Sequence, residues 1–470
     1  MLSAATIARL KEAAGPKGWT EDPAEIAPHL REWRDKFQGA TPLMLKPDTV
    51  AQVSALVAIC AETRTPLVPQ GGNTGLAGGQ IPHGQVLLSL TRLNRVRALD
   101  TADNTLTCEA GVTLAAAQAH AAEADRLFPL SLASEGSATI GGVVSTNAGG
   151  TAVLRYGNAR DLVLGLEAVL PDGRVWNGLR ALRKDNTGYD LKQLFIGAEG
   201  TLGVVTAAVL KLYPAVKTAA TAIAAVPDPA AAVSLLHVMQ AASGGAISAF
   251  EIMPRIGIDF VTRHMPGARD PLAVAHPWYV LIEATSAAAD APLRTMLETG
   301  LTQARESRRV RDAVIAESDA QSAQFWRLRE AMSEAQKYEG GSIKHDVSVP
   351  VSRMADFIAA AEAAVTRACP GVRVVAFGHI GDGNVHFNLS QPLDADKAAF
   401  LARWEELNSV VHGIAHQMGG SISAEHGLGR LKRDAILAYK SDVEMDLMRT
   451  VKRALDPINI MNPGAVVGPA

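Results

Sequence analysis

The chain has 470 residues, of which 48% are hydrophobic and 20% are charged, and its formal net charge is −3. This length and composition predict two or more domains with sizeable buried cores, and they exclude a disordered chain. The near-neutral charge, without a basic block, argues against a nucleic-acid partner. Cys60, Cys108 and Cys369 form no CxxC pair, so we expect reduced cysteines in a cytoplasmic protein.

The sequence also argues against a membrane-spanning protein. The N-terminus lacks the long apolar core of a signal peptide. The most apolar stretch, residues 218–242, is interrupted at Pro227-Asp228-Pro229, and each half is too short to cross a bilayer. We therefore expect no transmembrane segment, while peripheral contact with the inner membrane and formation of a homodimer are left open.

Hydrophobic periodicity and turn residues predict the secondary structure. A helix should follow Thr49, because apolar residues from Val50 to Cys60 recur with the spacing of one buried face. In chain order we then expect strands at 66–69, 86–90 and 106–110, a helix from Leu114, and a hairpin joining 166–170 to 174–177. Strands at 219–226, 247–252 and 278–284, with helices after the first and third, predict a separate α+β domain after residue 215.

Two segments of small residues indicate close approach of the backbone to a ligand. Residues 69–79 follow a strand and contain five glycines, and residues 129–152 are rich in small residues with almost no charge. Glycine permits positive φ angles, so successive N–H groups can form a cradle for an anion. Residues 69–79 match neither the P-loop nor the dinucleotide-binding fingerprint, because no Gly-Lys-Ser/Thr and no immediate helix follow.

The 69–79 loop and residues 134–150 of the second segment, together with 197–203 (GAEGTLG) and Asn462-Pro463-Gly464, resemble the FAD-binding flavoproteins of the vanillyl-alcohol oxidase/p-cresol methylhydroxylase type. Within that family the D-2-hydroxyglutarate and D-lactate dehydrogenase branch is most similar, and the resemblance covers nearly the whole chain. It implies an α+β protein with a two-subdomain FAD-binding fold, an inserted α+β substrate (cap) domain and a C-terminal return segment. We expect the FAD-binding domain over 1–215, the substrate domain over 216–420 and the return segment over 421–470.

The resemblance also implies which residues bind FAD. They are Pro69, Gln70, Gly71, Gly72, Asn73, Thr74, Gly75, Gly78 and Gly79 in the first loop, Ser134, Gly136, Ser137, Ile140, Gly141, Ser145 and Ala148 in the second segment, and Glu199, Gly203, Val204 and Asn462. Some relatives attach FAD through His or Cys. Neither occurs within 69–79, although His83 lies just outside, so we expect non-covalent FAD.

A histidine motif at 378–386 (GHIGDGNVH) predicts a metal site. If Asp382-Gly383 forms a two-residue hairpin turn, His379 lies directly across from His386, with Cβ atoms about 5 Å apart. Two imidazoles so placed can share one metal ion. The resemblance implies Glu425 as the third ligand and His426 as the catalytic base, which requires the chain to turn beside Gly427. Zn²⁺ is the expected metal, with Mn and Fe as alternatives.

The resemblance further implies that Arg329, Ser333, Lys344 and Asn388 contact substrate. Ser333 stands where the family has threonine, and Arg327 is a competing cation. Two cationic groups fit a dicarboxylate better than lactate.

We therefore expect an FAD-dependent dehydrogenase that oxidises a D-2-hydroxy acid to the 2-keto acid. D-2-hydroxyglutarate is the preferred substrate, with D-lactate or another D-2-hydroxy acid as alternatives. The metal activates the hydroxyl, His426 takes its proton, and hydride passes to flavin N5. An electron-transfer flavoprotein, a quinone or a cytochrome then accepts the electrons. The alternatives are a non-redox flavoenzyme similar to alkylglycerone-phosphate synthase, an oxidase that uses oxygen, and a non-enzymatic metal-binding protein.

Overall fold

The computed structural model describes residues 2–468, and the chain folds into two compact units. The first contains the residues up to Gly150, Gly157–Ala215 and the residues from Glu425 onwards. The second contains Thr151–Tyr156 and Val216–Ala424. The polypeptide therefore passes into the second unit twice, briefly over Thr151–Tyr156 and again over Val216–Ala424, and returns to the first unit at Glu425.

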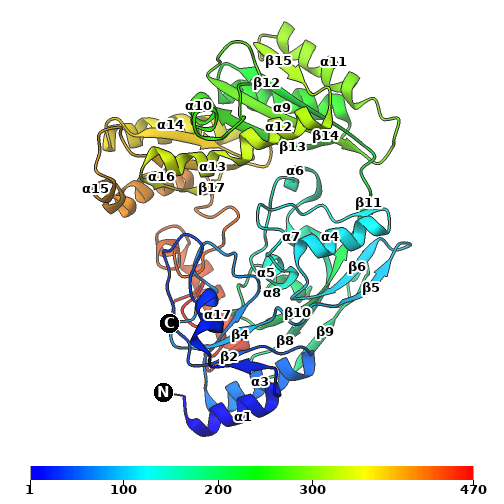
Figure 1. Ribbon diagram of the computed structural model, residues 1–470, viewed down its shortest axis with the longest axis vertical. Helices are drawn as coiled ribbons and strands as arrows, with labels where there is room; N and C mark the ends of the chain where they lie inside the picture. Colours follow the sequence, from blue (N-terminus) through cyan, green and yellow to red (C-terminus); the bar gives the residue numbers. More distant parts are fainter. Residues whose placement is uncertain (1, 469–470) are drawn as a thin grey trace. The chain divides into compact units, whose positions relative to one another are not determined.

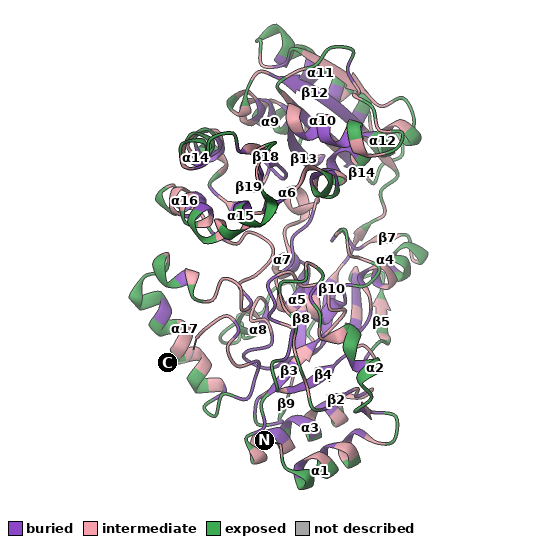
Figure 2. Ribbon diagram, turned by 60° about the vertical axis from the view of Figure 1, so that its left-hand side comes forward, coloured by how far each residue is buried: buried purple, intermediate pink, exposed green. Residues whose placement is uncertain are grey.

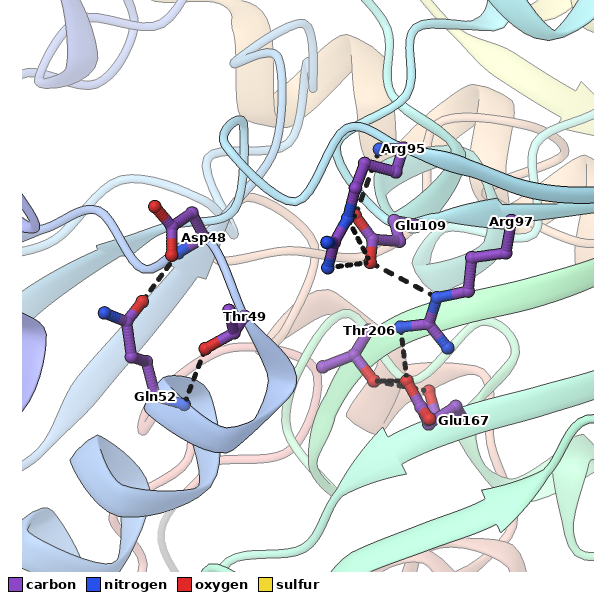
Figure 3. Close-up of polar contacts among 8 residues, drawn as sticks. All are labelled: Asp48, Thr49, Gln52, Arg95, Arg97, Glu109, Glu167 and Thr206. Carbon is purple, nitrogen blue, oxygen red and sulfur yellow. Dashed lines mark hydrogen bonds and ion pairs between the residues drawn. The ribbon is translucent and has the colours of Figure 1, made fainter.

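The first unit carries the N-terminal helices, two larger sheets and one two-stranded sheet (Figure 1). Its helices are α1 (Ala4–Ala14), α2 (Pro23–Ile26), η1 (Ala27–His29), α3 (Val50–Thr63), α4 (Leu114–Glu123), α5 (Ile140–Ser145), α7 (Ala159–Leu162), α8 (Lys192–Phe195), η4 (Ala435–Ala438) and α17 (Asp442–Leu455). Its strands are β1 (Trp19–Thr20), β2 (Met44–Leu45), β3 (Leu67–Gln70), β4 (Val86–Ser89), β5 (Val96–Asp100), β6 (Thr105–Glu109), β7 (Arg126–Leu127), β8 (Val163–Val169), β9 (Val175–Gly178), β10 (Val204–Lys211) and β11 (Tyr213–Pro214). The predicted helix after Thr49 is confirmed, and the Thr49 hydroxyl caps it by accepting from the Gln52 N–H at 3.2 Å (Figure 3).

The first sheet has the order β1-β2-β4-β3, with β2, β4 and β3 parallel, and the second is antiparallel with the order β5-β6-β10-β8-β9. Leu67 of β3 also bridges Met461 in parallel, so the C-terminal segment extends the first sheet at the β3 edge. The apolar face of α3 packs on β3 and β4 in one core that includes Met461, and Figure 2 colours these buried strands purple. The return of the chain is therefore held by both backbone pairing and core packing.

A network of charges crosses one face of the second sheet (Figure 3). Arg97 bridges Glu109 and Glu167 at 3.2 and 3.0 Å, while Arg95 also binds Glu109 and the Thr206 hydroxyl donates to Glu167. Burial alone would raise the pKa of Glu109, but the hydrogen bonds from Arg95 and Arg97 outweigh it and lower this pKa. Buried carboxylates need such partners. The acceptors Glu109 and Glu167 are both taken up by donors from other strands of the same sheet. The network therefore has a structural role.

The second unit contains two further sheets and their covering helices. Its helices are α6 (Val153–Tyr156), α9 (Pro229–Ser243), α10 (Arg255–His264), α11 (Leu293–Glu306), α12 (Asp319–Glu330), α13 (Met332–Ala335), η2 (Gln336–Glu339), η3 (Val351–Arg353), α14 (Met354–Ala368), α15 (Lys397–Ala402) and α16 (Trp404–Gln417). Its strands are β12 (Thr218–Val226), β13 (Ile247–Pro254), β14 (Trp278–Ser286), β15 (Asp312–Ile315), β16 (Ser342–Ile343), β17 (Asp346–Ser348), β18 (Arg373–Phe377) and β19 (Asn384–Ser390).

The sheet β13-β14-β12-β15 is antiparallel and has a helical layer on each face (Figure 1). Because strand side chains alternate, Phe250 and Ile252 of β13 pack in the core with α9 and α11. Met253 belongs to the opposite core, with α10 and α12. Glu251 follows the same alternation and points towards the α12 side.

In the remaining sheet β19 lies between β18 on one side and β16 and β17 on the other. Val385, Phe387 and Leu389 of β19 are wholly buried in the core shared with α14 and α16. The alternate residues His386 and Asn388 therefore lie on the opposite face. Within residues 2–468, no helix is both long enough and apolar enough to traverse a lipid bilayer.

Glu339 makes part of the second unit's stability pH-dependent. It binds Arg263 and His264 of α10, each at 2.7 Å, and Arg373 of β18. Burial alone would raise its pKa, yet these partners lower the pKa from 4.5 to about 2. A lowered folded-state pKa stabilises the protein above the unfolded-state value, and this contribution is lost as the pH falls towards 2.

Glu339→Gln should therefore lower the Tm at pH 7, and the difference from the wild type should shrink between about pH 4.5 and 2. Calorimetry across this range measures it. Glu406→Gln, which removes the exposed ion pair with Arg403, is the control and should change the Tm little. A Tm difference that is constant with pH would contradict this role of Glu339.

Candidate functional site

The predicted two-residue hairpin at Asp382-Gly383 is wrong. The strand register pairs Phe377, not His379, with His386, and the connection covers residues 378–383. Gly378 instead exchanges two backbone hydrogen bonds with Ile252 of β13, at 2.8 and 3.0 Å. Because Gly378 pairs with β13 and not with β19, the connection between β18 and β19 is longer than a two-residue turn.

The longer connection still brings the two histidine rings together. Their centroids lie 5.5 Å apart with the planes inclined by 76°. His379 is buried, and His386 keeps partial exposure beside the Phe377 ring. Two imidazoles at this separation can hold one metal ion between their nitrogens.

Glu251 orients His379. The pairing of Gly378 with Ile252 sets the neighbouring residues Glu251 and His379 side by side. The Glu251 Oε1 atom lies 2.6 Å from His379 Nδ1, and its Oε2 lies 2.5 Å from Arg329 Nε. Burial alone would raise the pKa of Glu251, but the charges and hydrogen bonds of Arg329 and His379 hold this pKa at about 2.

An ionised Glu251 has two consequences for the site. It accepts the Nδ1 proton of His379, which leaves Nε2 as the nitrogen with a lone pair, the arrangement seen when a carboxylate supports a metal-binding histidine. The Arg329 Nη2 atom lies 3.3 Å from that same Nε2, so a fixed positive charge stands beside the nitrogen that would bind a metal. Glu251 was not among the residues predicted from the sequence, although a lone carboxylate in the otherwise apolar run 247–254 (ISAFEIMP) was a signal.

The residues predicted to bind substrate gather in the second unit around β19. Arg329 is buried at the end of α12, whereas the competing Arg327 is exposed and donates to the Pro266 carbonyl. Lys344 Nζ donates to the Ser333 hydroxyl at 2.7 Å. Asn388 lies on the same face of β19 as His386, two residues further along. Arginine, lysine and amide donors near a histidine pair make a set suited to an anionic, oxygen-rich ligand.

In the first unit, the two glycine-containing segments pack directly on each other. A Cβ atom on Gly71 would lie 2.2 Å from Thr139 Oγ1, and one on Gly72 would lie 1.7 Å from the Ser137 carbonyl oxygen. No larger side chain fits at either position. The backbones of the loop and of 137–139 therefore form a continuous lining of small residues, which suits the diphosphate of a dinucleotide cofactor.

Gly72→Ala tests this packing. The added methyl group collides with backbone, and overpacking of this kind costs about 1–3 kcal/mol. We expect the FAD dissociation constant to rise roughly 10–100-fold, measured by fluorescence titration of the apoprotein. Gly413→Ala, at a helical position with open space around it, is the control, and equal FAD affinities in the two variants would contradict the prediction.

Glu199 joins the cradle to the segment that carries Glu425 and His426. Its carboxylate accepts the Leu428 N–H at 2.8 Å and the Gly429 N–H at 3.0 Å. Burial raises the pKa of Glu199, and these backbone hydrogen bonds oppose that rise. The Asn462 side-chain amide donates to the carbonyls of Gly79 and Glu199 at 2.9 and 2.8 Å. The first loop, the 197–203 segment and the C-terminal segment are thus tied together.

The chain turns after His426, which confirms the predicted turn beside Gly427. Gly427 and Gly429 have φ angles of 72° and 50°, which favour glycine. The Glu425 Oε1 atom accepts the Gly150 N–H at 3.0 Å. Glu425 and His426 thus stand in the first unit together with the predicted FAD-binding residues, while His379, His386 and the predicted substrate-binding residues belong to the second.

Comparison with known proteins places this architecture. Residues 216–466 match the family described as FAD linked oxidases, C-terminal domain, and residues 41–178 match the FAD binding domain. A probable D-2-hydroxyglutarate dehydrogenase, mitochondrial, of Oryza sativa subsp. indica is 38% identical over 469 residues, which cover 99% of this chain and 82% of the relative. The chain belongs to the FAD-linked oxidase family.

A second relative in the FAD-linked oxidase family is the D-2-hydroxyglutarate dehydrogenase of Xanthomonas citri pv. viticola, which is 37% identical and matches 97% of this chain and 96% of its own length. Among solved structures, p-cresol methylhydroxylase with substrate bound aligns with a TM-score of 0.78 and 18% identity over 99% of this chain and 96% of that one. The predicted fold of the vanillyl-alcohol oxidase type is therefore confirmed.

Proposed function

We propose that the protein is an FAD-dependent dehydrogenase that oxidises a D-2-hydroxy acid, D-2-hydroxyglutarate in the first place, to the 2-keto acid. The observation that carries this proposal is the pair His379 and His386 with the Glu251–Arg329 ion pair behind it. It combines nitrogen ligands for a metal with a buried cation for a carboxylate. Relatives that match at least 97% of this chain and are named for D-2-hydroxyglutarate support the choice of substrate.

We propose that His379, His386 and Glu425 hold the metal, Zn²⁺ in the first place with Mn or Fe as alternatives. Ala424 donates its N–H to the Asp346 carbonyl at 3.3 Å, and Asp346 pairs with His386 across β17 and β19. Glu425 is the next residue along the chain after Ala424. Two nitrogens and one carboxylate oxygen suit these metals, and the ion would supply a Lewis acid for the substrate hydroxyl.

FAD, held non-covalently by the glycine loop and its partner segments, would supply the two-electron acceptor. His426 takes the proton from the substrate hydroxyl, a role for which imidazole is suited near neutral pH. Arg329 and Lys344 bind the substrate carboxylates, and Ser333 and Asn388 fix the orientation of the acid. The electron acceptor that reoxidises the cofactor, an electron-transfer flavoprotein, a quinone or a cytochrome, is left open.

The experiment is anaerobic reduction of the bound flavin by a panel of 2-hydroxy acids. D-2-hydroxyglutarate should bleach the flavin fastest, D-lactate and D-malate more slowly, and the L-enantiomers negligibly. Bleaching by none of them would overturn the proposal and favour a non-redox flavoenzyme. Stoichiometric peroxide in air would assign an oxidase, and a colourless purified protein would point to a non-enzymatic role.

A further inference from the structure

Gln336 has a buried side-chain amide of which only the oxygen has a hydrogen-bond partner. It opens η2, is 0% exposed, and its Oε1 accepts the Asn388 side-chain N–H at 2.9 Å. Its Nε2, which carries two N–H donors, has no hydrogen-bond partner among residues 2–468. Native proteins rarely leave a fully buried donor unmatched, because its lost hydration is not replaced. An acceptor from outside the chain would complete this group.

The surroundings of Gln336 show where that acceptor would be. Its partner Asn388 lies on the face of β19 that also carries His386, and same-face residues two positions apart on a strand are separated by about 6.6 Å. Ser390, the next residue on this face, is also wholly buried, and its hydroxyl has no partner among the described residues. A polar strip thus leads away from the proposed metal ligand His386 along β19.

Hydrogen-bond donors from the α13–η2 segment and from Lys344 accompany this strip. Ser333 stands three residues before Gln336, a separation that places both on one side of the α13–η2 segment. Lys344 Nζ contacts the Ser333 hydroxyl at 2.7 Å. Ammonium and amide N–H groups match a carboxylate, which only accepts hydrogen bonds, better than an apolar substituent.

Resting on the proposed function, we propose that Gln336 is a specificity-determining residue whose Nε2 donates to the distal carboxylate of a dicarboxylic 2-hydroxy acid. When the hydroxyl-bearing carbon is at His386, a side chain of two methylene groups and a carboxylate reaches along the strip towards Asn388 and Gln336. The methyl group of D-lactate does not reach, so it leaves the Nε2 donors unmatched. Gln336 thereby favours the diacid.

The test compares Gln336→Met, which keeps the volume and removes the donors, with Gln336→Glu, which replaces the donors by a negative charge. We expect kcat/KM for D-2-hydroxyglutarate to fall about 10–100-fold in Gln336→Met, and further in Gln336→Glu, while kcat/KM for D-lactate changes less than about threefold. Gln391→Met is the matched control. The Gln391 side chain accepts the Gly341 N–H and donates to the Ala395 carbonyl, so both ends of its amide have partners within the protein. Its ratio between the two substrates should stay at the wild-type value.

A parallel fall for both substrates in Gln336→Met would show a structural role and overturn the proposal. Binding of glutarate and of butyrate to the FAD-loaded protein, measured by calorimetry, separates this result from failure of the proposed function. If no 2-hydroxy acid reduces the flavin but Gln336→Met still weakens glutarate and spares butyrate, the diacid contact stands without the proposed reaction. Equal glutarate affinity in wild type and Gln336→Met would refute the contact.

Discussion

Replacing His426 with alanine should slow reduction of the bound flavin by D-2-hydroxyglutarate about 10²–10⁴-fold, the usual contribution of a general base. FAD should stay bound, because the glycine cradle at 71–72 and 137–139 does not include His426. The turn itself should persist, since Glu199 holds it through the N–H groups of Leu428 and Gly429. Anaerobic stopped-flow absorbance measures the rate, and the flavin spectrum before mixing reports occupancy.

His83→Ala is the matched control for this variant. His83 is an exposed histidine of the same unit, placed on a short bridge with Ala40, and its removal should leave the reduction rate within about twofold. A wild-type rate in His426→Ala would remove His426 as the base. Loss of FAD in His426→Ala would assign it to cofactor binding instead.

Removal of the metal should abolish turnover without releasing FAD. The proposed nitrogen ligands lie in the second unit and the glycine cradle in the first, so chelation leaves the cradle intact. His386→Ala should have the same effect on activity as chelation, because a single histidine and a carboxylate make an incomplete site. Elemental analysis measures the loss of metal, and flavin absorbance of the same sample measures the retention of FAD.

Glu251→Gln gives a graded version of the same experiment. It keeps both histidines but replaces the charged acceptor of the His379 Nδ1–H, and changes to such supporting carboxylates typically weaken metal binding about 10–100-fold. Competition with a chromophoric chelator measures the affinity. His237→Ala, an exposed histidine of the same unit, should bind metal as the wild type does. Full activity in metal-free protein would reject the Lewis-acid role altogether.

The sequence predicted those features that depend on neighbouring residues. The helix after Thr49, the hairpin at β8 and β9 and the strands β3, β4, β6, β12, β13 and β14 follow from apolar periodicity and turn residues, which act within a few positions. Neutral, small-residue composition likewise identified the glycine loop and the segment around Ser137. The family resemblance then supplied the fold and the chemistry of the histidine motif.

Only the tertiary structure decided how the histidines are held. The sequence placed His379 opposite His386 through a tight turn, but Gly378 pairs with Ile252, and His379 meets Glu251 across 128 residues of chain. A hydrogen bond over that separation leaves no periodic trace in either segment, because the pattern of a strand records which face is buried and not which strand lies beside it. For the same reason, the sequence does not show that Gln336 is buried against Asn388 with its Nε2 atom unpartnered.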